Sequence, residues 1–126
     1  MADSSRSPVV NLAEKLASFS DHWNPRIVGR YNGNEIRLAK LKGEFVWHSH
    51  AETDELFMVL KGRLTIEFRD GVRTLGPGEF LVVPKGVEHR PVAPEEVELL
   101  LIDREGELNT GTQPISELTR ATLETL

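Results

Sequence analysis

The sequence contains no cysteine. This excludes disulfide bonds, thiolate metal ligands and cysteine nucleophiles, so any metal site must use nitrogen and oxygen ligands. There is also no apolar run near the roughly 18 residues that a membrane-spanning helix needs. The N-terminus lacks the basic start and apolar core of a signal peptide. We therefore expect a cytoplasmic protein that does not engage a membrane.

Basic residues are in the minority. The 126 residues include 15 Lys and Arg against 20 Asp and Glu, and the net charge is −5. The basic residues form no cluster that could follow a phosphate backbone, which argues against nucleic acid as a partner. A chain of this length forms one domain that buries roughly two-thirds of its unfolded surface. A small molecule is the better candidate for a ligand or substrate.

Composition divides the chain into three stretches. Residues 1–10 predict a flexible N-terminal tail, residues 11–106 predict the folded domain, and residues 107–126 predict a C-terminal tail. Pro114 can begin a helix in this C-terminal tail. The alternatives are a frayed segment or one that docks on the domain or on a partner.

A short helix is expected before the first strand. Asn11 and Glu14 have the spacing of a capping box, and apolar residues follow at helical intervals, which predicts a helix from about residue 12 to 18. The next turn-forming stretch contains Trp23. Packing on the rim of the domain is favoured for Trp23 over stacking on a substrate.

From Arg26 onward the pattern is typical of short β-strands. Asn32-Gly33 predicts a hairpin turn because Asn and Gly accept positive φ. Strands with turns about every 8–12 residues and no intervening helix indicate a sandwich or a barrel. The expected strands are 26–31, 35–42, 44–48, 56–60, 63–68, 72–75, 80–83 and 97–102.

Three strands are apolar at consecutive positions: 56–60, 80–83 and 99–102. Both faces of such strands favour burial. One face can fill the domain interior, whereas the other needs cover from the N-terminal segment, the C-terminal tail or a second subunit. A homodimer is the simplest solution, and we expect one.

Three of the four histidines are grouped with a carboxylate. His48 and His50 are two residues apart, so they point to one side of a strand. Glu55 begins the next strand, and His89 lies in a second stretch framed by Gly and Pro. Imidazole and carboxylate are ligands for divalent first-row metals, so we predict that these four residues hold one metal ion. His22, in the loop beside Trp23, is interpreted as structural or solvated.

The stretches that contain these residues resemble the two motifs of the cupin family. The matching residues of the first motif are Gly43, His48, His50, Glu55 and Gly62, and those of the second are Gly78, Pro84, Gly86 and His89. The resemblance covers about 43–93 and implies a small single-domain cupin of the type-2 class. Two details differ from the family pattern: only four residues separate Gly43 from His48, and Ala93 replaces an asparagine that is frequent in relatives.

The fold class that follows is all-β, a cupin-type jelly-roll β-barrel with a short N-terminal helix and, in one alternative, a C-terminal helix. Glu52 and Asp54 are rival candidates for the carboxylate ligand. Cupin spacing favours Glu55, and strand parity places it on one face with the predicted pocket lining. That lining is expected to comprise Val46, Phe57, Val59, Leu64, Ile66 and Phe68.

The metal itself can be iron, nickel, manganese, zinc or copper. Four protein ligands on an octahedral ion leave two positions for water, substrate or O₂. Trp47 has the opposite parity to His48 and is expected to pack outside the pocket. Arg37 and Lys40 could anchor an anionic substrate if they faced inward, although solvated or barrel-end positions are favoured for both.

Three functions are consistent with this pattern. The resemblance implies a metal-dependent enzyme on a small, oxygen-rich molecule, because cupin relatives include dioxygenases and sugar or keto-acid isomerases. The alternative is a non-catalytic cupin that binds or senses a small ligand. A barrel whose metal serves only stability is the third. Fold alone does not decide among them, because function lies in the site.

Overall fold

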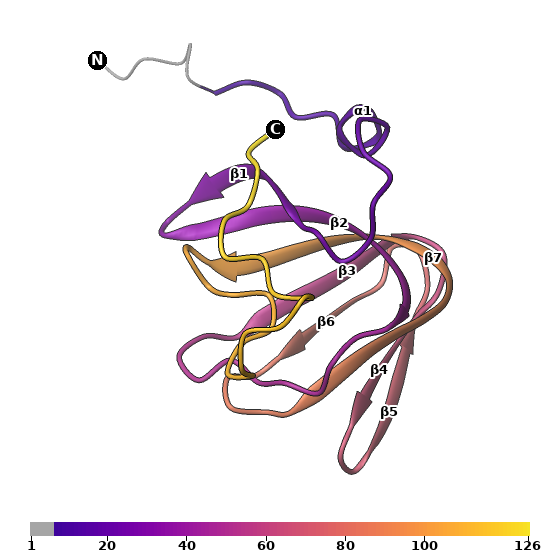
Figure 1. The fold of residues 1–126 in the computed structure, drawn as a ribbon. Helices are drawn as coiled ribbons and strands as arrows, with labels where there is room; N and C mark the ends of the chain where they lie inside the picture. Colours follow the sequence, from indigo (N-terminus) through magenta and orange to yellow (C-terminus); the bar gives the residue numbers. More distant parts are fainter. Residues whose placement is uncertain (1–6) are drawn as a thin grey trace.

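The computed structural model describes residues 7–126 and consists mainly of antiparallel β-strands (Figure 1). Within this range the only helix is α1, and it is too short to span a bilayer. The elements in chain order are α1 (Leu12–Leu16), β1 (Arg26–Tyr31), β2 (Asn34–Glu44), β3 (Glu55–Lys61), β4 (Leu64–Phe68), β5 (Gly71–Leu75), β6 (Phe80–Val83) and β7 (His89–Arg104).

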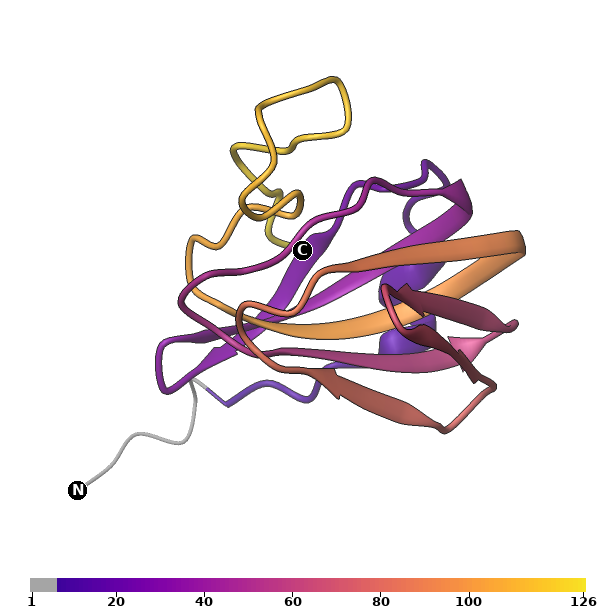
Figure 2. The same ribbon diagram turned by 90° about the horizontal axis from the view of Figure 1, so that it is seen from below.

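The strands curl into an open barrel (Figures 1 and 2). Their order is β1-β2-β7-β3-β6, and β4 lies between β7 and β5. Strand β7 joins the two walls, because residues 89–92 pair with β4 whereas residues 99–102 lie between β2 and β3. The predicted jelly-roll class and the short N-terminal helix are confirmed.

The helix starts where the capping box predicts. The Asn11 side chain accepts a hydrogen bond from the Glu14 backbone N–H at 3.0 Å, which satisfies one free amide of the first turn. Leu16 and Phe19 then pack with Val28 and Leu38 on the outer face of the sheet. The N-terminal segment thus covers part of the second apolar face that the sequence predicts.

The observed strands differ from the predicted ones in two places. Strand β7 begins at His89, well before the predicted 97–102, because its first residues pair with β4. Pro91 takes part in this pairing, opposite Ile66, although it has no N–H to donate. The predicted strand 44–48 does not form. Residues 45–54 form a loop instead, in which only His48 makes a β-bridge.

The C-terminal segment forms turns rather than the alternative helix, and it docks on the barrel. Thr112 N–H donates to the Ser49 carbonyl at 2.9 Å, and Leu126 N–H donates to the Ile27 carbonyl at 2.9 Å. Gly111 permits this close approach, since its φ is +55° and a Cβ there would collide with the Ser49 backbone. Of the predicted flexible tail, residues 1–6 lie outside the described range.

Candidate metal centre

One loop and the first residues of two strands, β3 and β7, bring the predicted ligands together. His48 and His89 form a β-bridge in which each backbone N–H donates to the other's carbonyl, at 3.0 and 2.9 Å. His50 follows His48 in the same loop, and Glu55 is the first residue of β3. The pairing of distant backbone segments, rather than one regular strand, therefore aligns the imidazoles.

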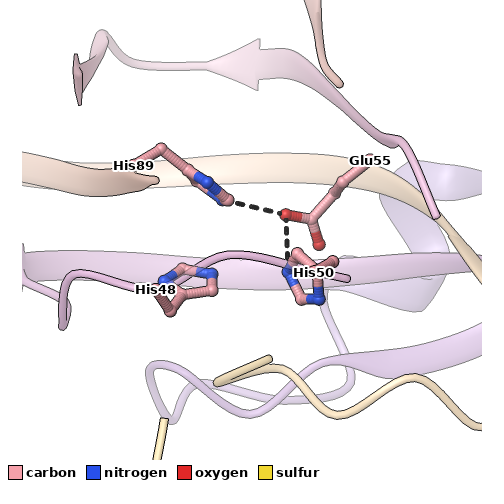
Figure 3. Close-up of side chains that lie close together, drawn as sticks. All are labelled: His48, His50, Glu55 and His89. Atoms are coloured by element: carbon pink, nitrogen blue, oxygen red, sulfur yellow. Dashed lines mark hydrogen bonds and ion pairs between the residues drawn. The ribbon is translucent and has the colours of Figure 1, made fainter. Parts of the chain in front are cut away.

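The four side chains converge on one point inside the barrel (Figure 3). Each offers a ligand atom, and all of these atoms lie within 4.8 Å of one another. Glu55 Oε1 lies 3.3 Å from Nε2 of His50 and 3.3 Å from Nε2 of His89. All four residues are at most 4% exposed. The ligand atoms would need to move together only slightly for one ion to lie about 2.0–2.2 Å from each of them.

Hydrogen bonds fix which ring nitrogen of each histidine faces the centre. His48 Nδ1 donates to the Val46 carbonyl at 2.9 Å, and His89 Nδ1 donates to the Val87 carbonyl at 3.0 Å. His50 Nδ1 instead donates to the carboxylate of Glu107 at 2.9 Å. These bonds leave the three Nε2 lone pairs directed inward, as metal-binding histidines require.

The donor set fits a divalent metal ion. The Nε2 atom of His50 is buried and has no hydrogen-bond partner within the described chain, an arrangement that costs free energy unless a ligand completes it. The combination of three imidazoles and one carboxylate suits first-row transition metals. The sequence-based choice of residues is therefore consistent with the geometry.

Metal binding needs neutral imidazoles and an ionised carboxylate; the pKa shifts of His48 and Glu55 favour these forms, whereas that of His50 opposes them. Burial, followed by the neighbouring His89, lowers the pKa of His48 to about 4, so this imidazole is neutral at pH 7. Burial alone would raise the pKa of Glu55, but the imidazoles of His50 and His89, whose Nε2 atoms lie 3.3 Å from its carboxylate, hold it well below its ordinary value. Burial alone would lower the pKa of His50, yet Glu55 and Glu107 raise it.

The rival residues lie elsewhere. Glu52 and Asp54 are exposed, and Asp54 accepts a hydrogen bond from the Lys85 backbone N–H at 2.9 Å. His22 pairs with Glu96 at 2.7 Å, outside the centre. Trp47 packs under Arg69, whose guanidinium carbon lies 3.8 Å from the ring centroid. These placements agree with the interpretations drawn from the sequence.

A cavity adjoins the four-residue cluster. Its empty volume is about 420 Å³, including the open mouth. His48 and Glu55 form the part of its wall that belongs to the cluster. The remaining lining residues are Trp23, Pro25, Arg37, Ala39, Leu41, Phe45, Phe57, Pro91, Leu99, Leu101, Asp103 and Asn109.

This lining corrects the prediction at five of its six positions. Of the six, only Phe57 borders the cavity; Val59, Leu64 and Ile66 lie in the core away from it, and Phe68 packs against that core. Val46 is replaced in the wall by its neighbour Phe45, since the chain at 45–47 is a loop and strand parity does not apply.

A buried charge cluster, which the sequence does not reveal, borders the cavity through Arg37 and Asp103. The Arg37 guanidinium bonds the Glu35 carboxylate at 2.7 Å, Asp103 Oδ2 at 3.2 Å and the Glu107 carbonyl at 2.9 Å. Burial and then the neighbouring Glu55 raise the pKa of Asp103 well above its ordinary value. Arg37 is therefore buried rather than solvated, and it holds β2, β7 and the C-terminal segment together.

Replacing Asp103 with asparagine should stabilise the metal-free protein progressively, relative to wild type, as the pH rises from about 5 to 8. The raised pKa of Asp103 means that the folded chain keeps a proton which the unfolded chain has released. This contribution to stability is complete below the ordinary pKa of 3.8 and is lost as the pH rises towards the folded-state pKa. The slope is at most about 1.4 kcal/mol per pH unit.

Urea denaturation with a chelator at several pH values measures this difference. The exposed Asp54 supplies the matched control, and D54N should give no comparable pH trend. If the D103N difference stayed constant across the range, Asp103 would not carry the proton.

The barrel, the convergent histidines and the adjoining cavity define a small β-barrel protein built around one candidate metal centre. Residues 35–103 match the cupin domain family, Cupin_2, and the chain belongs to that family. A cupin-2 domain protein from Shewanella frigidimarina NCIMB 400 is 47% identical, with a TM-score of 0.76 over 77% of this chain and 95% of its own.

Two further comparisons bear on function. The uncharacterized protein YdbB of Bacillus subtilis (strain 168) is 41% identical over 80 residues, which are 63% of this chain and 65% of that protein. The match thus spans slightly less than two-thirds of this curated relative. Hydroquinone 1,2-dioxygenase PnpCD, solved with Cd2+ and 4-hydroxybenzonitrile, shares 19% identity and a TM-score of 0.69 over 84% of this chain and 78% of its own. At that identity the likeness concerns the fold alone.

Proposed function

We propose that this cupin is a metal-dependent enzyme of the dioxygenase or isomerase type that acts on a small molecule. The observation that carries the proposal is the cavity beside four buried, convergent ligand side chains. A bound divalent ion would supply Lewis acidity and open coordination positions for an oxygen donor of the substrate. Iron, nickel, manganese, zinc and copper all remain candidates for this ion.

The chain's own residues have separable tasks in this proposal. His48, His50, Glu55 and His89 bind the ion, and Glu107 orients His50 through the Nδ1 hydrogen bond. The apolar cavity wall excludes water and positions the substrate body. A dioxygenase of the same fold, PnpCD, has been solved with a divalent ion and a phenol, which supports the plausibility of such a site.

A cupin that only binds or senses a ligand is the second candidate, and the cavity supports it equally. The purely structural metal is less favoured, because such sites are closed by protein ligands whereas this cluster borders a cavity. Ligand-induced stabilisation without turnover would identify the sensing role.

The test begins with elemental analysis of untagged protein by inductively coupled plasma mass spectrometry, before and after anaerobic reconstitution. We expect about one divalent ion per chain. Oxygen uptake with catechols and diketones then separates a dioxygenase from an isomerase, which would convert its substrate without consuming O₂. A protein that held no metal after reconstitution with each candidate ion would refute the proposal.

We also propose that two chains associate through the outer face of β6. Phe80 and Val82 are 64% and 46% exposed, on a strand at the end of the sheet order, and the half-buried Leu56 and Met58 lie on the adjacent strand. Light scattering after gel filtration should give a dimer for wild type and a monomer for F80K/V82K. V72K, at an exposed valine on β5, is the control. A monomeric wild type at about 100 µM would contradict the proposal.

A further inference from the structure

We infer that the cavity accepts a ligand with a flat, apolar body, such as an aromatic ring, and a single metal-binding oxygen group at one end. This inference rests on the proposed function, because the oxygen group would be held by the ion in the four-residue cluster. It replaces the oxygen-rich molecule expected from the sequence with a different substrate class.

The first argument is the composition of the wall. Three aromatic side chains line the cavity, and six aliphatic or proline residues complete its apolar surface. Trp23 and Phe45 are stacked at 4.8 Å between ring centroids, with only 16° between their planes. A sugar or polyol would leave its hydroxyl groups without partners against such a surface, at a cost of a few kcal/mol. A flat apolar body gains from the same contacts.

The second argument is the conformation of Trp23. Its φ is +58°, a left-handed value that is strained for a residue with a large side chain. Two hydrogen bonds to β2 hold it there: its backbone N–H donates to the Lys40 carbonyl at 3.0 Å and its indole N–H donates to the Lys42 carbonyl at 2.9 Å. Rim packing alone does not require this strain. The strained backbone of Trp23 is explained if its indole must be held in the cavity wall.

The third argument concerns charge. Among residues 7–126, Arg37 is the only lysine or arginine that lines the cavity. Four of its five N–H donors are already used: Nε and Nη2 bond Glu35, Nη1 bonds Asp103 and Nη2 also bonds the Glu107 carbonyl. The part of the wall that the structure describes therefore offers no free cation to pair with a second anionic group, so a dicarboxylate or a phosphate ester fits poorly.

The Asn109 side chain, also in the wall, already bonds the backbone of Leu118 and Arg120, so the polar groups that remain are those of His48, Glu55 and Asp103, and Asp103 neighbours Glu55. His48 and Glu55 belong to the metal cluster, and Oδ1 of Asp103 is buried without a hydrogen-bond partner in the described chain. A ligand whose oxygen group lies at this end can satisfy Asp103 while its body contacts Trp23, Phe45 and Phe57. The distribution of polar and apolar atoms thus sets the orientation as well as the class of the ligand.

Two hydroxamates test this inference, because benzohydroxamate and acetohydroxamate share the metal-binding group and differ only in a phenyl or methyl body. The zinc-loaded protein should bind benzohydroxamate at least about tenfold more tightly, measured by calorimetry. Oxalate, which binds metals through two charged oxygens and has no body, should bind more weakly than benzohydroxamate. In W47F, where Trp23 is the only tryptophan, benzohydroxamate should change the fluorescence and oxalate should not.

Variants at the two tryptophans sharpen the result. W23A should reduce the preference for benzohydroxamate to about twofold or less, whereas W47A, at the tryptophan under Arg69, should preserve it. If W23A did not fold, F45L should lower the preference instead. The ratio of the two hydroxamate affinities in the wild-type protein would still test the inference. Equal binding of the two hydroxamates by zinc-loaded protein, or tighter binding of oxalate than of benzohydroxamate, would overturn this inference but not the proposed function. Failure to load any metal would overturn the proposed function as well.

Discussion

Replacing His50 or His89 with alanine should reduce bound metal from about one ion per chain to background. Each histidine supplies an Nε2 atom that a buried carboxylate, Glu55, already faces at 3.3 Å. Loss of one of the four protein ligands removes a strong bond to the ion. Elemental analysis after reconstitution measures the occupancy, and circular dichroism tests whether the barrel persists.

The chain contains its own control in His22, the fourth histidine. It pairs with Glu96 outside the centre, so H22A should bind the same amount of metal as wild type. E55Q, which keeps the shape but removes the charge, should weaken binding strongly, whereas E52Q and D54N should not. Full occupancy in both H50A and H89A would refute the ligand assignment.

Replacing Arg37 with methionine should destabilise the protein by about 3–5 kcal/mol, the largest loss of folding free energy that we expect from one substitution. Arg37 is 2% exposed, and its removal leaves the Glu35 and Asp103 side chains buried without their cation. Methionine fills a similar volume, so the loss would come from charge rather than from a cavity. Urea denaturation measures it as a lower midpoint.

Two further variants separate charge from packing. R30M removes an exposed arginine of β1 and should change stability by no more than about 0.5 kcal/mol. E35Q/R37M/D103N removes the cation together with the Glu35 carboxylate and the Asp103 carboxyl group, so it should recover much of the R37M loss. If the triple variant were no more stable than R37M, the contribution of Arg37 would lie in packing.

Local signals in the sequence predicted much of this structure. Asn11 caps the helix and Asn32-Gly33 turns the first hairpin because each acts within a few residues of itself. The motif residues of the candidate centre were predictable for a related reason. His48, His50 and Glu55 lie within eight consecutive residues, and the resemblance supplied His89.

The missed features all depend on contacts between distant segments. Trp23 reaches the cavity only because β2 carbonyls hold it, and Glu107 reaches His50 only because the C-terminal segment folds back. Val46 was expected in the wall because strand parity was applied to a stretch that is a loop. Arg37 gave no local sign of burial, since its three partners lie on β2, β7 and the C-terminal segment. Residue patterns within one strand cannot report such partners.

The central place of β7 also has a consequence for how the chain folds. This strand pairs with β2, β3 and β4, all of which precede it by long stretches of sequence, as in the pairing of Glu35 with Asp103. Such non-local pairing must offset the entropy of closing long loops and is slow to form. During synthesis, His48 and Glu55 emerge well before His89. The ligand set is therefore completed only after β7 has been synthesised and has closed the barrel.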